Sequence, residues 1–135
     1  MSNLGQCRLI RSGETYDGKQ GFSSREGISA QSVGAQGPCT HLLTIPPGGR
    51  AKARLHSAHE TAIYVLSGAA EMWHGDRLQH CMRVGAGDML YIPAGEPHLP
   101  FNSGPEPVVA VIARTDPNEQ ESVTLLPELE ALVRR

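Results

Sequence analysis

The chain has 135 residues, of which 39% are hydrophobic and 19% charged, so it has the size and composition of one folded domain. The formal net charge of −2 gives no basic surface for nucleic acid or acidic lipid, and no apolar run approaches the roughly 18 residues of a membrane span. No signal peptide is visible, and the three cysteines (Cys7, Cys39 and Cys81) form no C-x-x-C pair. We therefore expect a cytoplasmic protein that binds neither nucleic acid nor membranes.

Glycine and proline divide the chain into short segments. The 15 glycines and 10 prolines separate short aliphatic or β-branched runs, a pattern typical of many short strands joined by turns. The predicted strands lie at 8–11, 28–33, 40–45, 51–55, 62–67, 70–74, 78–84, 89–92, 98–101 and 107–113. Such chains close into a barrel or a two-sheet jelly roll, which protects the strand edges.

Helical signals appear only at the C-terminus, over 126–135. Pro127 stands near the start, with glutamates in the first turn and arginines in the last, an order that suits the helix dipole. An apolar stripe is expected to pack as a lid: Leu129, Leu132 and Val133. We expect a single domain with an N-terminal wrapping segment and strands at 1–38, a barrel core at 39–114, and a C-terminal turn and helix at 115–135.

The most informative segment runs from Gly87 to Asn102. Its fixed positions follow the pattern G-x5-P-x-G-x2-H-x3-N, with Pro93, Gly95 and His98 between the two ends. The pattern predicts a buried strand, a tight reversal and a histidine that begins the next strand. It resembles the second cupin motif at every defined position.

The first cupin motif, G-x5-H-x-H-x3,4-E-x6-G, has a partial counterpart from Gly48 to Gly68. His56 occupies the second histidine position, but Arg54 stands where the first histidine is expected. The acidic position falls on Glu60 when counted from His56 and on the neighbouring threonine when counted back from Gly68.

The resemblance extends over residues 39–114 and identifies the chain as similar to the small, single-domain, RmlC-like bacterial cupins, a group with no assigned reaction. It implies an all-β fold, the double-stranded β-helix or cupin jelly-roll barrel. It also implies a divalent metal ion (Fe, Mn, Ni, Cu or Zn) at one end of the barrel, held by three histidines and a carboxylate, and often a dimer.

Four residues are candidates for holding the metal. His56 and His98 lie at motif positions, whereas Arg54 cannot be deprotonated and cannot be a ligand. His59 shares strand parity with the barrel-facing position 61 and is the favoured third ligand, unless a turn after His56 breaks the strand. Glu60 is the alternative, and a degenerate site without tight metal is the third possibility. Arg54 then either binds an anionic group of the substrate or pairs with Glu60.

The remaining residues of interest lie outside both motifs. His41, His74 and His80 are expected to have no part in the site. A further set is expected in the core: Met72, Met89, Tyr64, Tyr91 and Trp73.

Two functions follow from the resemblance. The first is a metal-binding cupin that acts on a small polar metabolite by isomerase- or dioxygenase-type chemistry. The second is a non-catalytic cupin that binds a small molecule at a degenerate metal site. A homodimer is expected in either case, because the segments at 62–66 and 108–113 carry apolar outer faces.

Overall fold

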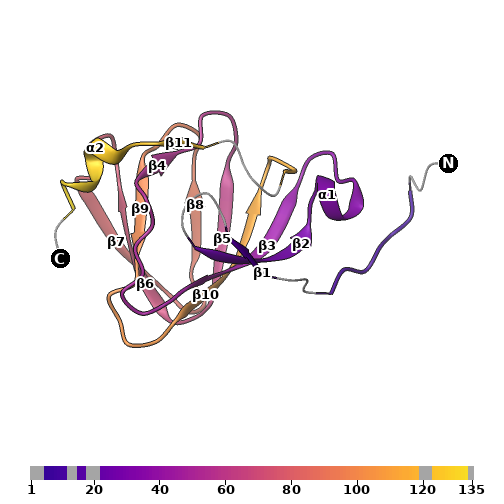
Figure 1. Cartoon of the computed structure of the whole chain (residues 1–135), viewed down its shortest axis with the longest axis horizontal. Coiled ribbons are helices and arrows are strands. Elements are labelled where there is room, and N and C mark those ends of the chain that lie inside the picture. The colour runs from indigo at the N-terminus through magenta and orange to yellow at the C-terminus, as the bar shows by residue number, and fades with distance from the viewer. Residues whose placement is uncertain (1–4, 12–14, 18–21, 119–122, 134–135) are drawn as a thin grey trace.

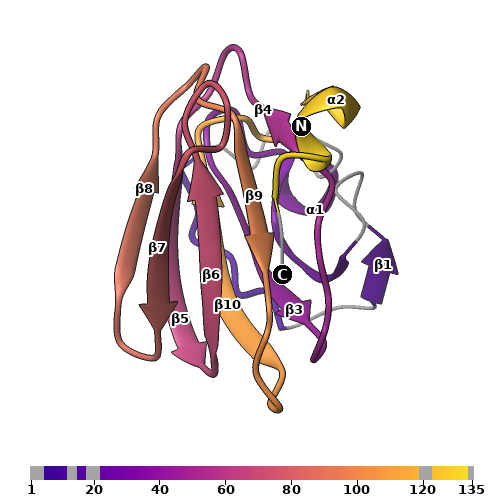
Figure 2. The ribbon, with the colours of Figure 1, turned by 90° about the vertical axis from the view of Figure 1, so that its left-hand side faces the viewer.

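The computed structural model describes residues 5–11, 15–17, 22–118 and 123–133. These residues form two antiparallel sheets that face each other (Figures 1 and 2). The first sheet has the strand order β1 (Thr15–Asp17), β2 (Ser23–Ile28), β3 (Cys39–Ile45), β10 (Val108–Arg114), β5 (Thr61–Ser67), β8 (Met89–Ile92). The second has the order β11 (Thr124–Leu125), β4 (Arg54–Leu55), β9 (His98–Phe101), β6 (Ala69–His74), β7 (His80–Gly85). The predicted double-stranded β-helix is confirmed.

The main core lies between the sheets. Strand alternation turns one face of each strand inward, so Val65 of β5, Met72 of β6 and Val108 of β10 are buried in one cluster. The opposite face of the second sheet carries a smaller cluster that contains Leu99 and Phe101 of β9. The main core between the sheets is therefore apolar, and the second sheet packs apolar residues on both of its faces.

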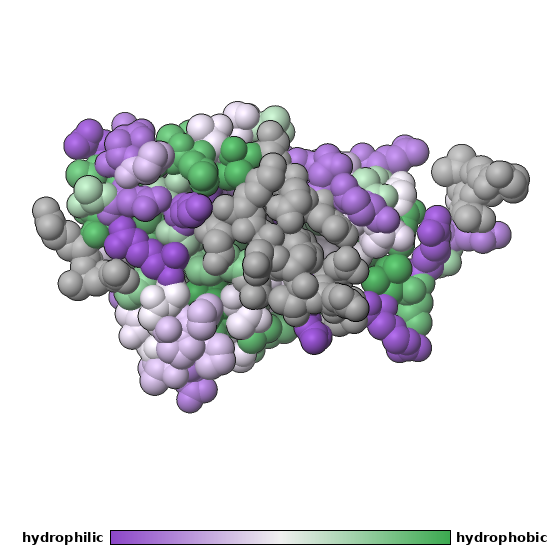
Figure 3. All heavy atoms as spheres, viewed as in Figure 1, coloured by the Kyte–Doolittle hydropathy of each residue, from purple (hydrophilic) through white to green (hydrophobic). Residues whose placement is uncertain are grey.

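The C-terminal segment covers this outer cluster. The helix α2 (Pro127–Glu130) is shorter than predicted, and it lies beside β4 and β11 (Figure 1). Leu129 and Val133 pack into the cluster, which confirms the predicted lid, but Leu132 is 41% exposed. The Glu130 carboxylate accepts a hydrogen bond from the Ala53 amide at 3.1 Å and so fixes the helix to the strand that leads to the site. Hydrophilic and hydrophobic residues intermingle on the surface at this end (Figure 3).

Motif residues hold the turns of the barrel. Gly68 has φ +80°, and a Cβ there would collide with the Pro107 carbonyl oxygen, so only glycine fits this position. Asn102 is fully buried, and its amide donates to the carbonyl oxygens of Ile45 at 3.0 Å and Glu106 at 2.7 Å. Gly68 and Asn102 are therefore motif positions with a structural role in the turns of the barrel.

Three strand predictions need correction. Residues 8–11 are in no strand, and the predicted strand 51–55 is reduced to Arg54–Leu55. The strand 28–33 is wrong, because β2 ends at Ile28 and the short helix α1 (Ala30–Val33) follows. Ser29 caps this helix by accepting from the Ser32 amide, and Gly34 ends it at φ 72°. The β-branched residues Ile28 and Val33 favoured a strand prediction, but the cap at Ser29 makes the segment between them a helical turn.

Three residues assigned to the core are on the surface. Met89, Tyr91 and Tyr64 are 82%, 59% and 41% exposed. They lie on β8 and β5, where Tyr64 is directly opposite Met89. Their neighbours of opposite parity, such as Ile92 and Val65, are the ones that face the core.

Neither helix in the described part of the chain is long and apolar enough to cross a membrane.

Candidate metal and ligand site

Pairing between strands brings the two motifs together at one end of the barrel. Arg54 of β4 is the direct partner of His98 of β9. The Gly95 amide donates to the His56 carbonyl oxygen at 2.7 Å and joins the reversal of the second motif to the end of the first. Arg54, His56 and His98 are 7%, 4% and 1% exposed and line the same cavity between the sheets.

His59 joins this group by an unexpected route. The chain bends at residues 57–58, so the strand does not continue back to His59 as the parity argument required. Even so, His59 is only 4% exposed, and its ring centre lies 4.5 Å from that of His56. The Glu60 amide donates to the Thr115 hydroxyl at 3.0 Å, and this bond anchors the bend to the end of β10.

Glu60 faces the other way. Its side chain is exposed and accepts a hydrogen bond from the Tyr91 hydroxyl at 2.6 Å on the outer surface. This bond raises the pKa of Tyr91. The next residue, Thr61, is buried and lines the cavity. Of the two ways to count the motif, the one ending on Thr61 reaches the interior, and no carboxylate stands at that position.

The hydrogen bonds of His98 leave one ring nitrogen facing inward. Its Nδ1 lies 2.9 Å from the backbone oxygen of Glu96, and a carbonyl can only accept, so the ring proton is on Nδ1. Nε2 is buried and has no hydrogen-bond partner among the described residues. Burial, and then the charge of Arg54, hold the His98 pKa well below its usual value. The imidazole is therefore neutral near pH 7, with a lone pair on Nε2.

The ring spacing can be compared with metal geometry. Imidazoles bound at about 2.0–2.1 Å, at angles between square and tetrahedral, have ring centres roughly 4.5–5.2 Å apart. The observed separations are 4.5 Å for His56–His59 and 5.1 Å for His56–His98. No group of three His, Cys, Asp or Glu in the described ranges is arranged to hold a metal ion as it stands. Neutral imidazoles are suitable ligands for a divalent transition metal, and the two ring separations from His56 fall in the range expected for rings bound to one ion.

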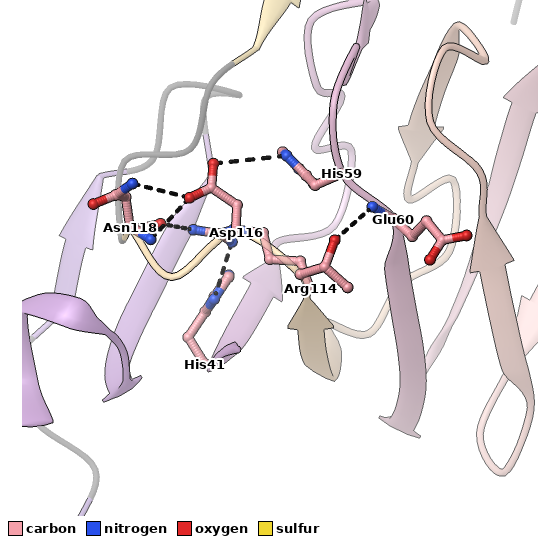
Figure 4. A network of polar contacts seen from close by, with 7 residues as sticks. His41, His59, Glu60, Arg114, Asp116 and Asn118 are labelled. Atoms are coloured by element: carbon pink, nitrogen blue, oxygen red, sulfur yellow. Dashed lines mark hydrogen bonds and ion pairs between the residues drawn. The ribbon is translucent and has the colours of Figure 1, made fainter. Parts of the chain in front are cut away.

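A polar network contacts the His59 ring on its Nδ1 side (Figure 4). Its Nδ1 is 3.7 Å from a carboxylate oxygen of Asp116. The Asn118 amides hold the other oxygen of Asp116 at 3.0 Å, and Arg114 donates to the Asn118 backbone oxygen at 2.6 Å. Arg114 also donates to Nδ1 of His41 at 3.4 Å. One chain of contacts thus runs from His41 on β3 to His59.

His41 and Arg114 are site residues that the motif search missed. Both are buried and line the cavity. Burial, and then the Arg114 charge, lower the pKa of His41 to about 4. Strand parity could have found them, since Arg114 continues the inward series of Ala110 and Ile112. By contrast, His74 and His80 stand at the end of the β6–β7 hairpin, outside the cavity lining.

The geometry defines a two-sheet β-barrel with a buried histidine cluster at one end. The Cupin domain family matches residues 41–113, more than half of the chain. The chain belongs to the cupin family.

Solved structures agree on the fold. A Klebsiella pneumoniae protein with a double-stranded β-helix domain is 21% identical with a TM-score of 0.62, and the match covers 87% of this chain and 88% of that one. A Thermotoga maritima protein described as a predicted oxalate decarboxylase is 18% identical with a TM-score of 0.66, over 80% and 98%. Oxalate decarboxylase from Bacillus subtilis is 21% identical with a TM-score of 0.69, over 90% of this chain and 32% of that one. No curated relative matches the chain.

Proposed function

We propose that this cupin binds one divalent transition-metal ion through His56, His59 and His98 and acts on a small polar metabolite. The observation that carries the proposal is the Nε2 atom of His98, which is buried and without a described partner beside two further imidazoles. A buried nitrogen lone pair without a partner is costly, and a metal ion would satisfy it. One of the similar structures is described by the Mn(II) centers of Bacillus subtilis oxalate decarboxylase, so a protein of this fold can hold a divalent ion.

Asp116 supports the choice of His59 as the third ligand. A carboxylate near one imidazole nitrogen orients the ring and raises the basicity of the other nitrogen. Glu60 lacks this inward orientation because it is bound to Tyr91 on the outer surface. The metal, when bound, would supply a Lewis acid or activate oxygen, which suits isomerase- or dioxygenase-type chemistry.

Arg54 favours a second candidate function, a cupin that binds a small molecule without catalysis. Its buried cation occupies the position of a family ligand, next to His98. The guanidinium charge of Arg54 would repel a metal ion bound to the neighbouring His98 and so lower the affinity of the site for metal.

Metal titration distinguishes the two candidates. Protein treated with EDTA and then dialysed is titrated separately with Mn²⁺, Fe²⁺, Ni²⁺, Cu²⁺ and Zn²⁺ in a calorimeter. The metal-dependent function predicts one equivalent bound per chain for at least one of these ions. No saturable binding of any ion would reject it in favour of the non-catalytic cupin.

We further propose a cytoplasmic homodimer. The three cysteines are widely spaced and form no C-x-x-C pair, which favours a reducing compartment. Tyr64, Leu66, Met89 and Tyr91 are exposed on β5 and β8, and a second copy would cover this apolar surface. Light scattering should give twice the 14.5 kDa chain mass; a monomer at micromolar concentration contradicts the dimer.

A further inference from the structure

The cavity between the sheets has an apolar body and a cationic end. It encloses about 70 Å³. Most of its lining is aliphatic, from residues such as Leu43, Val65 and Met72. Two arginines contribute to the lining from opposite sheets, Arg54 on β4 and Arg114 on β10.

The cavity lining contains two buried cations. Both guanidiniums are at most 7% exposed and remain protonated at any ordinary pH. The lining contains one carboxylate side chain, Glu71, and it is only half-buried. His41 is neutral near pH 7 because its pKa is about 4. Arg54 and Arg114 donate to the backbone oxygens of Lys52 and Asn118, and an anionic group in the cavity would add charge-assisted hydrogen bonds to these.

Hydrogen-bond donors point to the same class of ligand. Arg114 donates to His41 Nδ1, so the single proton of the neutral imidazole is on Nε2. His98 Nε2 is an acceptor in the cavity lining, whereas the guanidiniums, this imidazole N–H and the Thr61 hydroxyl can all donate into the cavity. An acceptor-rich group such as a carboxylate matches them.

Cavity size limits the rest of the ligand. The 70 Å³ is several times the roughly 10–15 Å³ that one water needs, so the cavity admits a small ligand. A sugar phosphate or a nucleotide is too large, and the aliphatic lining favours a short carbon chain.

We propose that the substrate is a small monocarboxylate, whose carboxylate binds between Arg54 and Arg114 and whose apolar end occupies the barrel. This inference rests on the proposed function for the identity of the site, because it places the ligand beside the imidazoles of His56 and His98. It assigns a binding role to Arg114, which lies outside both motifs.

The test compares isobutyrate with isobutyramide, two probes of nearly equal shape that differ in charge. Binding is measured by ligand-observed NMR on EDTA-treated protein and on the same protein after Zn²⁺ addition. Isobutyrate should bind at least about tenfold more tightly than isobutyramide, because a buried charge-assisted hydrogen bond is lost with the amide. Citrate, with about twice as many non-hydrogen atoms, should not bind. Equal binding of the two isosteres, or no binding of isobutyrate in either form of the protein, would overturn the inference.

Variants locate the carboxylate. Arg114→Gln and Arg54→Gln should each weaken isobutyrate binding about tenfold or more, whereas Arg77→Gln on the exposed β6–β7 turn should leave it unchanged. If either buried variant does not fold, the comparison of isosteres on the wild-type chain still decides. Zn²⁺ binding without preference for isobutyrate removes only the carboxylate inference. Isobutyrate binding without any metal binding removes only the metal site.

Discussion

Two pairs of histidines in the barrel have nearly the same spacing and different surroundings. The ring centres of His56 and His98 are 5.1 Å apart, and those of His74 and His80 are 5.3 Å apart. His98 is 1% exposed, whereas His80 is exposed and the His74 side chain is 23% exposed. The proximity of two imidazoles therefore does not define a metal site by itself.

Glu96 shows how the two groups differ. Its backbone oxygen receives the Nδ1 proton of His98, while its carboxylate lies 2.9 Å from Nδ1 of His74. Both rings are thus oriented by one residue, but Nε2 of the inner ring is buried without a described partner, whereas the His74 side chain is partly exposed. The exposed pair can be hydrated, so a metal ion gains less by replacing water there. We conclude that burial of an oriented nitrogen distinguishes the candidate site.

The largest expected effect comes from removing the inner histidine. His98→Ala should weaken Zn²⁺ binding by about a hundredfold or more, since it deletes the best-oriented of three ligands. Calorimetric titration of the variant against the wild type measures this change. His80→Ala is the matched control and should retain wild-type affinity. Metal binding that survives His98→Ala but not His80→Ala would transfer the site to the hairpin.

Acid stability tests the burial of His41. Its folded-state pKa of about 4 is below the unfolded value of about 6.5, so the unfolded state takes up its proton first as the pH falls. This residue's contribution to stability should be lost between about pH 6.5 and 4, with a total of order 3 kcal/mol. Urea unfolding at several pH values measures the slope. His41→Gln should flatten it over this range, and an unchanged slope would show that His41 is not buried in solution.

Replacing the buried cation tests the first position of the motif. Arg54→His removes a positive charge next to His98 and adds an imidazole, so metal affinity should rise about tenfold to a hundredfold. Titration of Zn²⁺ into both proteins gives the ratio. An unchanged or lower affinity in a folded variant would mean that residue 54 does not face the ion.

The smallest effect is expected behind His59. Asp116→Asn keeps the shape of the side chain but removes its charge, which should lower metal affinity about tenfold. Asp76→Asn, on the exposed hairpin, is the control. Thermal unfolding of the metal-free proteins should be similar, so that the change is assigned to the ligand and not to the fold. Equal Zn²⁺ affinity in the wild type, Asp116→Asn and Asp76→Asn would contradict the proposal that the Asp116 carboxylate supports His59 as a ligand.

The motif residues made much of the barrel predictable. Strands 89–92 and 98–101 match β8 and β9 to the residue, because Gly87 and Gly95 fix the turns around them. The N-terminal elements were harder to predict. There the decisive contacts are local caps such as Ser29–Ser32, which a count of β-branched residues does not detect.

Site residues at motif positions could be predicted from the sequence. Those placed by tertiary contacts could not. His56 and His98 follow from fixed spacing, whereas His59 reaches the cluster only because a bend is anchored by Thr115, 55 residues from Glu60. His41 and Arg114 lie on strands distant in sequence that pair along the same sheet. Their shared inward parity was readable, but nothing in the sequence alone indicated that they line one cavity.

A single spectroscopic comparison tests the central claim most directly. Long-range ¹H–¹⁵N NMR of the imidazoles is recorded on EDTA-treated protein before and after one equivalent of Zn²⁺. Our account predicts that the Nε2 resonances of His56, His59 and His98 move together while those of His74 and His80 stay in place. Movement of the hairpin histidines at one equivalent, with the buried three unchanged, would contradict it.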